Sequence, residues 1–330
     1  MRWLVALLAA MMVALGALSW WVKQQQELLQ QPVKAVTQTL NVPKGMVLGN
    51  LLQQLQQQGW IDQTPDVRVI ARTHPELTQL KAGTYAVQGT LAGLLASIVA
   101  GQSVNYYFTI VPGWNLWQLQ AALQAEERLV QTMPAQLDQW SERLGLTGWP
   151  EGQFLPDTYA FSPGSSDLAL LKRAHAALQQ QLESAWNTKQ TTQLQSPAQL
   201  LTLASIIEKE TAVASERTHI AGVFEQRLAK GMRLQTDPTV IYGLLPDFDG
   251  NITRRNLRQK TPYNTYVIKG LPPTPIAMPS AASIQAAAQP MATKDLFFVA
   301  TGEGGHAFAE TLKEHQKNVQ AYLKRRRSQP

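Results

Sequence analysis

Residues 200–237 read LLTLASIIEKETAVASERTHIAGVFEQRLAKGMRLQTD, and the organisation of the chain is best worked out from this stretch. It is preceded by Ser196 and Pro197, a hydroxyl N-cap followed by proline at the first helical position, which predicts the start of a helix. The apolar run that follows carries two carboxylates, Glu208 and Glu210. Carboxylates on a largely buried helix are costly unless they are paired or used, so this helix is the first place to look for chemistry.

A second helical segment lies in the same stretch, with apolar residues from Ile220 to Leu228 and an end near Gly231. The polar residues Gln235, Thr236 and Asp237 come next. They predict a turn or a helix cap, with Asp237 as the capping residue.

The composition describes a folded protein with room for two domains. The chain has 330 residues, of which 45% are hydrophobic and 16% charged. Its net charge of +6 favours anionic surroundings such as nucleic acid, anionic lipid or a cell-wall polymer. The sequence contains no cysteine, which excludes disulfides, thiolate nucleophiles and cysteine-based metal sites.

The N-terminus carries an uncharged apolar run at residues 3–22. At about 1.5 Å per residue it spans roughly 30 Å, the thickness of a bilayer's hydrocarbon core. We therefore predict a transmembrane anchor over residues 1–22, with a short cytoplasmic N-terminus. A cleaved signal peptide is the alternative, because Ala17 and Ser19 have suitable spacing. The glutamine-rich residues 23–36 are interpreted as a linker.

Beyond the linker one pattern occurs twice: a short strand, a Pro-Gly turn and an amphipathic helix, first around Pro43 and then around Pro112. A further strand is predicted at 80–85, with a helix at 91–100. Later segments alternate between helices and proline-rich loops, and a last strand is expected at 296–300. The fold class predicted is α+β, with a small module at 37–103 and a larger domain at 104–330.

The two glutamates fall at opposite borders of the apolar face of their helix, so periodicity does not choose between them. Each could simply be a boundary residue paired with a nearby Arg or Lys. An apolar flank would instead raise the pKa of a glutamate and keep it protonated as a general acid.

Several long motifs, in the same order, resemble the YceG/MltG family of endolytic murein transglycosylases. The resemblance covers nearly the whole chain. The segments that carry it are EGQFLPDTY at 151–159, ASIIEKETA at 204–212, MRLQTDPTVIYG at 232–243, YNTY at 263–266, GLPPTPI at 270–276 and GHAF at 305–308.

This resemblance implies an N-terminal LysM-like module and a catalytic domain on the periplasmic side of the inner membrane. It implies cleavage between N-acetylmuramic acid and N-acetylglucosamine within nascent peptidoglycan strands, with Glu208, the first glutamate of the EKE triplet, as catalytic acid. The muramyl C6 hydroxyl is the nucleophile, so no second carboxylate is needed. No metal or cofactor is implied, and peptidoglycan synthases are the expected partners. A non-catalytic peptidoglycan-binding scaffold and a hydrolytic muramidase, with Asp237 as second carboxylate, stay open as alternatives.

If Glu208 is the acid, we expect it to face an open groove. The residues expected to bind substrate there are Gln235, Thr236, Asp237, Tyr263, Asn264, Glu151 and His306. Each has a structural alternative: a helix cap, a packed loop or a hydrogen-bonded core residue. The five histidines show no metal-ligand spacing, and no aromatic-basic pattern typical of nucleic-acid binding is present.

Overall fold

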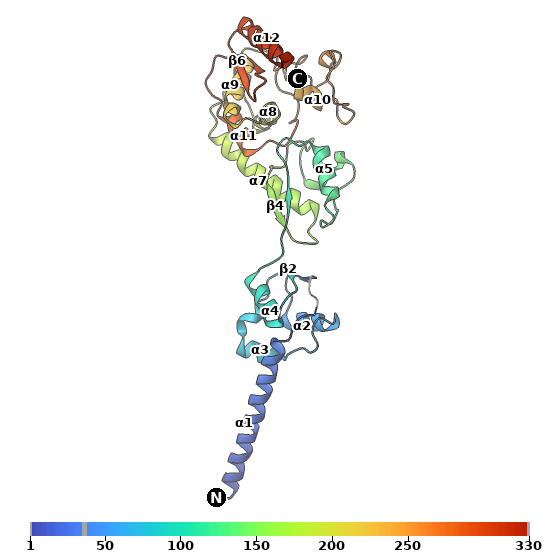
Figure 1. Ribbon diagram of the computed structural model, residues 1–330, viewed down its shortest axis with the longest axis vertical. Coiled ribbons are helices and arrows are strands. Elements are labelled where there is room, and N and C mark those ends of the chain that lie inside the picture. The colour runs from blue at the N-terminus through green and yellow to red at the C-terminus, as the bar shows by residue number, and fades with distance from the viewer. Residues whose placement is uncertain (1, 35–37, 329–330) are drawn as a thin grey trace. The chain divides into compact units, whose positions relative to one another are not determined.

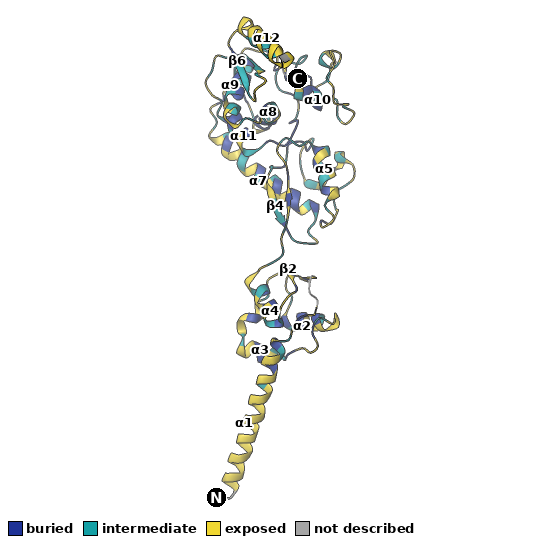
Figure 2. Ribbon diagram, viewed as in Figure 1, coloured by how far each residue is buried: buried dark blue, intermediate teal, exposed yellow. Residues whose placement is uncertain are grey.

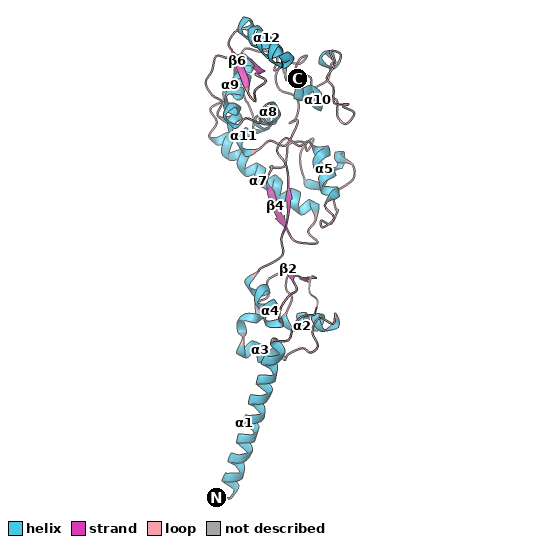
Figure 3. Ribbon diagram, in the orientation of Figure 1, coloured by secondary structure: helices cyan, strands magenta, loops and turns pink. Residues whose placement is uncertain are grey.

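The computed structural model describes residues 2–34 and 38–328, which form two compact units (Figure 1). The first unit contains residues 1–106 with 160–163, and the second contains 107–159 with 164–330. The boundary predicted between linker and module, at residues 36 and 37, lies outside the described residues. Helices and short two-stranded sheets alternate along the chain (Figure 3), in agreement with the α+β class.

The first unit begins with helix α1, Arg2–Leu29, which runs on past residue 22. Its segment Trp3–Leu29 is long and apolar enough to cross a membrane, as expected for a single-pass anchor. Figure 2 shows the exposed surface along this helix. Its last turn belongs to the folded part of the unit, because Leu29 is buried and the Gln25 side chain accepts a hydrogen bond from the Asp66 backbone.

The rest of this unit packs helices around one antiparallel pair of strands. Leu40 of one strand lies opposite Tyr85 of the other, and both side chains are buried. The elements are β1 Thr39–Val42, α2 Leu48–Gln57, α3 Val67–Thr73, the 3-10 helix η1 Pro75–Thr78, β2 Gly83–Ala86 and α4 Leu91–Ala100. The strand, turn and helix predicted around Pro43, and the strand and helix that follow, are confirmed.

The second unit is built around helix α8, Pro197–Glu210, which begins where the Ser196 hydroxyl accepts a hydrogen bond from the Gln199 backbone. Every residue of α8 from Leu200 to Ile207 is buried. Helices α7 Asp167–Asn187, α9 Arg217–Ala229 and α11 Ala281–Ala288 pack around it. Glycine is required at one point beside this core: a Cβ at Gly222 of α9 would lie 2.3 Å from the carbonyl oxygen of Met291, in the segment after α11.

The other elements of this unit enclose that core. They are α5 Leu116–Ala125, η2 Leu137–Gln139, α6 Trp140–Leu144, η3 Ala214–Glu216, α10 Asp237–Tyr242, η4 Asn256–Arg258, β5 Phe297–Ala300, β6 His306–Ala309 and α12 Leu312–Ser328. Two paired strands, β3 Tyr106–Thr109 and β4 Thr158–Phe161, each have residues in both units. Strand β6 was not predicted. It pairs antiparallel with β5, with Phe298 opposite Phe308. The polar segment does lead into a helix, but the N-cap of α10 is Thr236 and not Asp237, which is the first residue of that helix.

Candidate active site

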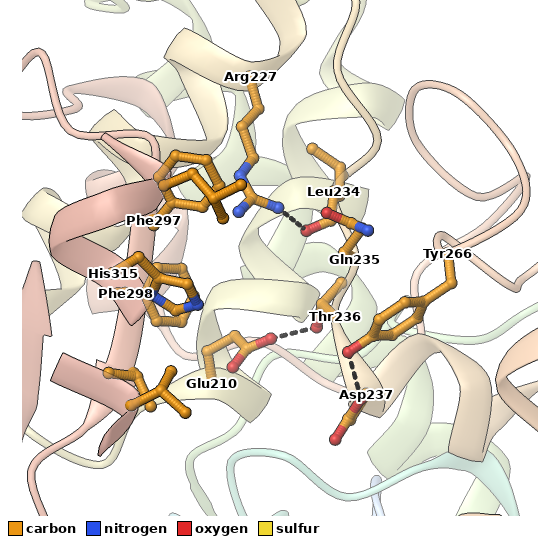
Figure 4. Close-up of a pocket in the computed structure, with 13 residues that line it drawn as sticks. Glu210, Arg227, Leu234, Gln235, Thr236, Asp237, Tyr266, Phe297, Phe298 and His315 are labelled. Carbon is orange, nitrogen blue, oxygen red and sulfur yellow. Dashed lines mark hydrogen bonds between the residues drawn. The ribbon is translucent and has the colours of Figure 1, made fainter. Parts of the chain in front are cut away.

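A cavity of about 490 Å³ lies beside the C-terminal end of α8 (Figure 4). One wall is polar and comes from the end of α8, the segment before α10 and the loop after η4. The facing wall is largely apolar and comes from β5 and α12. The lining residues are Glu210, Arg227, Leu234, Gln235, Thr236, Asp237, Tyr266, Phe297, Phe298, Val299, Leu312, His315 and Val319.

The buried guanidinium of Arg227 ties the two walls together. Its Nε donates to the Leu296 carbonyl at 2.6 Å, just before β5, and its Nη1 donates to the Leu234 carbonyl at 2.7 Å. Five donors in a rigid fork suit this bridging role. Nη1 also donates to the Arg233 carbonyl at 3.2 Å, so removing the guanidinium would leave three backbone carbonyl groups without this donor.

The polar wall is held in an unusual backbone conformation. Gln235 has φ of 51°, in the left-handed region that non-glycine residues rarely adopt. Hydrogen bonds from the Gln235 and Thr236 backbone nitrogens to Thr265 hold this conformation, at 3.2 and 3.1 Å. Such strain persists only where the surroundings impose it, and it concentrates at functional sites.

Glu210 is the carboxylate of α8 that reaches the cavity, where its side chain remains partly exposed. The Thr236 hydroxyl donates a hydrogen bond to its Oε1. Burial raises the pKa of Glu210, the negative charge of Asp237 raises it further, and the Thr236 hydrogen bond only partly opposes this. A carboxyl group in this setting retains its proton to higher pH than a solvent-exposed glutamate.

Asp237 lies in the same cavity and is held by Tyr266, whose hydroxyl donates to Asp237 Oδ1 at 2.6 Å. Burial and the neighbouring Asp237 raise the pKa of Tyr266, so its hydroxyl keeps the proton that it donates. Tyr266 was not among the predicted site residues. Its signal in the sequence was its place in the same YNTY motif as Tyr263 and Asn264.

Glu208 does not line this cavity, contrary to the expected geometry. Its Oε2 accepts hydrogen bonds from the Ser280 backbone at 2.9 Å, the Ser280 hydroxyl at 2.5 Å and the Ser283 hydroxyl at 2.6 Å. Ser280 is the N-cap of α11, so Glu208 places a carboxylate at the positive end of a helix. The surroundings of Glu208 are polar and not apolar as predicted.

Three further predicted residues lie outside the cavity lining. Tyr263 is half-buried, with its hydroxyl 2.8 Å from that of Thr274. Asn264 is buried, and its amide group donates to three backbone carbonyls of the loop 256–259. His306 has its Nδ1 2.7 Å from Glu216, in an ion-pair geometry. These contacts fit the structural alternatives considered for each residue.

Glu151 is fully buried, also outside the cavity lining. Its Oε2 accepts a hydrogen bond from the Leu116 backbone at 3.0 Å, at the first turn of α5. Its Oε1 has no hydrogen-bond partner among the described residues. Burial raises the pKa of Glu151 to about 7, and the hydrogen bond from Leu116 opposes this only in part.

His315 of α12 is a second lining residue that the sequence did not reveal. Its ring stacks on that of Phe297, with the two ring centroids 5.2 Å apart. Its buried Nδ1 has no hydrogen-bond partner among the described residues. Burial and then the charge of Arg227 lower the pKa of His315. A neutral imidazole at this position can donate or accept one hydrogen bond to a bound molecule.

Within residues 2–34 and 38–328, no group of three or more His, Asp or Glu side chains is arranged to hold a metal ion. The cavity itself offers the chemistry of carboxyl groups. One has a raised pKa, a second lies beside it, and hydroxyl and amide groups surround both.

Comparison with known proteins places this geometry in context. Residues 40–321 match the model of the YceG-like family. An endolytic murein transglycosylase from Bacillus subtilis (strain 168) is 37% identical over 173 residues, which cover 52% of this chain and 48% of that protein. An endolytic murein transglycosylase from Streptococcus pneumoniae serotype 2 (strain D39) is 31% identical over 185 residues, 52% of this chain and 32% of that protein.

The chain thus matches half or less of the length of these two relatives. Among solved structures, a yceG-like protein from Listeria monocytogenes superposes with a TM-score of 0.56 at 28% identity. That match covers 85% of this chain and 98% of the other.

Proposed function

Because this chain belongs to the YceG-like family, we propose that it is an endolytic lytic transglycosylase of peptidoglycan. It would cleave the bond between N-acetylmuramic acid and N-acetylglucosamine within nascent glycan strands, leaving 1,6-anhydromuramic ends that terminate strand elongation. The observation that carries the proposal is Glu210, whose raised pKa and position in a cavity with Gln235, Thr236 and Asp237 suit a general acid.

We assign the acid to Glu210 and not to Glu208. The Glu208 carboxylate accepts three hydrogen bonds on one oxygen at the start of α11, outside the cavity. Glu210 is the glutamate of the triplet that meets the polar wall expected to bind substrate. A volume of about 490 Å³ is within the range of roughly 300–1,000 Å³ usual for small-ligand sites, enough for part of a glycan strand.

The proposed reaction uses one carboxyl group twice. Protonated Glu210 gives its proton to the glycosidic oxygen as the bond from that oxygen to the muramyl C1 breaks. The carboxylate that results takes the proton of the muramyl C6 hydroxyl, and the C6 oxygen forms a bond to C1. Water is not consumed, the leaving sugar gains a hydroxyl, and Glu210 ends in its starting protonation state.

A hydrolytic muramidase is the second candidate, and one observation favours it: Asp237 lies in the same cavity as Glu210. In that reaction Asp237 would activate a water or attack C1 directly. The Tyr266 hydroxyl already donates to Asp237, which suits a residue that binds substrate in a fixed orientation. A non-catalytic scaffold is a third candidate, but it has no need of a carboxyl group with a raised pKa.

We further propose that α1 anchors the chain in the inner membrane, with its N-terminus in the cytoplasm and with the second unit and the remainder of the first in the periplasm. Residues 37–103 would then form a LysM-like glycan-binding module, and 104–330 the catalytic domain. This location would bring the cavity to newly made strands beside the peptidoglycan synthases. The exposed apolar surface of α1 supports the anchor.

Product analysis tests the function. Purified sacculi are incubated with the full chain in detergent, and the muropeptides released are separated and weighed. Anhydro ends support lytic cleavage, reducing ends show hydrolysis, and an absence of new ends leaves only a binding role. Internal cleavage is recognised by long soluble strands early in the digestion.

A further inference from the structure

A loop of the second unit presents a cluster of arginines that the proposed reaction does not use. Arg254, Arg255 and Arg258 lie within five residues, and all three are exposed. An open hollow of about 840 Å³ is lined by Thr253, Arg254, Arg255, Asn256, Arg258 and Gln259.

This loop is held in place by hydrogen bonds. Thr253 and Asn256 bond reciprocally, each backbone nitrogen donating to the other's side-chain oxygen at 2.9 and 3.2 Å. The buried Asn264 amide donates to the carbonyls of Asn256, Leu257 and Gln259 at 3.1, 3.2 and 2.7 Å. The arginines are therefore carried by a fixed backbone, which lowers the entropy lost when a ligand binds.

The three guanidinium groups form no ion pair with an acidic side chain in the described part of the chain. The segment 245–260 contains four cationic residues, these arginines and Lys260, and two acidic residues, Asp247 and Asp249. A net positive loop with unpaired guanidinium groups fits a ligand with several anionic oxygens, since each guanidinium matches a carboxylate in bidentate geometry.

The loop and the cavity share one support. The side chain of Asn264 donates to the loop carbonyls through its amide nitrogen, and its Oδ1 accepts a hydrogen bond from the Tyr266 backbone at 3.0 Å. Tyr266 lines the cavity and donates to Asp237. The arginine loop and the Tyr266 side of the cavity are thus connected through the single side chain of Asn264.

We propose that Arg254, Arg255 and Arg258 form a subsite for the free carboxylates of the peptide stems on the glycan strand. The inference rests on the proposed function, because that function supplies the peptide-bearing substrate. The loop then selects strands whose stems keep their negative charge. Asn264 is a positioning residue: its side chain fixes the backbone of the loop that carries the three arginines.

The experiment compares the variant R254Q/R255Q/R258Q with a control of equal charge change, K324Q/R326Q/R327Q at the exposed end of α12. Binding of full-length protein, in a Glu210→Gln background, is measured to three substrates. These are intact soluble strands, strands whose stem carboxylates have been amidated, and strands stripped of peptide by an amidase. Thermal unfolding of each variant confirms that it is folded.

Each exposed ion pair contributes little by itself, so losing all three should weaken binding to intact strands by roughly 3- to 150-fold. Binding to amidated and stripped strands should change less than threefold, and the control should match the parent on all three. Equal loss on all three substrates, equal loss in the control, or no loss on intact strands would each overturn the subsite. Failure of the function itself appears separately, as wild-type protein that binds strands without producing anhydro ends.

Discussion

Replacing Glu210 by glutamine removes the proton that the proposed reaction needs and changes little else. Gln has the same volume, and its carbonyl oxygen can still accept the hydrogen bond from the Thr236 hydroxyl that Glu210 accepts now. General acid–base catalysis by one group contributes about 10²–10⁴-fold. Because the same carboxyl group would serve as acid and then as base, we expect E210Q to lose at least about 10³-fold in the rate of anhydro-end formation.

The variant should remain folded. Burial raises the pKa of Glu210, so the carboxyl group stabilises the folded state most below the pKa of the unfolded chain, and this contribution is lost as pH rises through the folded pKa. E210Q should therefore be at least as stable as the parent at pH 8. In the parent, activity should fall on the alkaline side as Glu210 ionises, at a pH above the ordinary glutamate pKa.

Glu208→Gln is the matched control, two residues away on the same helix. We expect less than a tenfold change in its rate, with a loss of stability of about 1–3 kcal/mol, because three donors at the start of α11 lose a charged acceptor. Both rates come from muropeptide analysis at several pH values, and stability from thermal unfolding. An inactive E208Q beside an active E210Q would refute the assignment and move the acid to Glu208.

Three further changes test the framework around the site. Glu151→Gln should raise the free energy of unfolding at pH 8 by up to about 3 kcal/mol and leave it unchanged near pH 4. The reason is that a Glu151 pKa raised from 4.5 to about 7 costs stability as the pH rises through that range. Urea unfolding from pH 4 to 8 measures the difference, and parallel pH profiles of the parent and the variant would contradict the prediction. Gly222→Ala should lower the free energy of unfolding by about 1–3 kcal/mol or more, because the added Cβ would meet a backbone carbonyl. The control Gly49→Ala adds a Cβ whose nearest contact is at 3.7 Å, so it should be neutral or stabilising. Thermal unfolding measures both variants. Asn264→Ala should lower the free energy of unfolding by about 2–4 kcal/mol, because three backbone carbonyls of the loop lose their donor. The amide hydrogens of residues 253–260 should then exchange faster. Asn251→Ala, at an exposed position, should change neither quantity.

The helices that begin with a clear cap could be predicted from the sequence. Ser196 and Pro197 mark the start of α8, and its buried apolar face follows directly from its pattern. Strand β6 could not be predicted in this way. It has only four residues, follows a glycine-rich turn, and is defined by its pairing with β5, a contact that local pattern does not encode.

The candidate site was predicted only where one short segment carries it. Gln235, Thr236 and Asp237 form one continuous segment, and all three line the cavity. In the YNTY motif the tyrosine that lines the cavity is the last one, Tyr266, because the loop turns between the two tyrosines and directs only the second toward Asp237. His315 reaches the same cavity from α12, more than a hundred residues beyond Glu210, and no local signal marks such a distant contact.

The geometry of one helix end explains why the EKE triplet has two glutamates with separate tasks. Successive residues of an α-helix point about 100° apart, so Glu208 and Glu210 point about 200° apart and cannot enter one cavity side by side. Glu208 therefore meets the start of α11, and Glu210 meets Thr236 on the opposite side. Lys209, between them, donates to the Gly113 carbonyl at 3.1 Å. The first glutamate and the lysine fix the end of α8 against two neighbouring segments, and this fixed end is what holds the second glutamate toward the cavity.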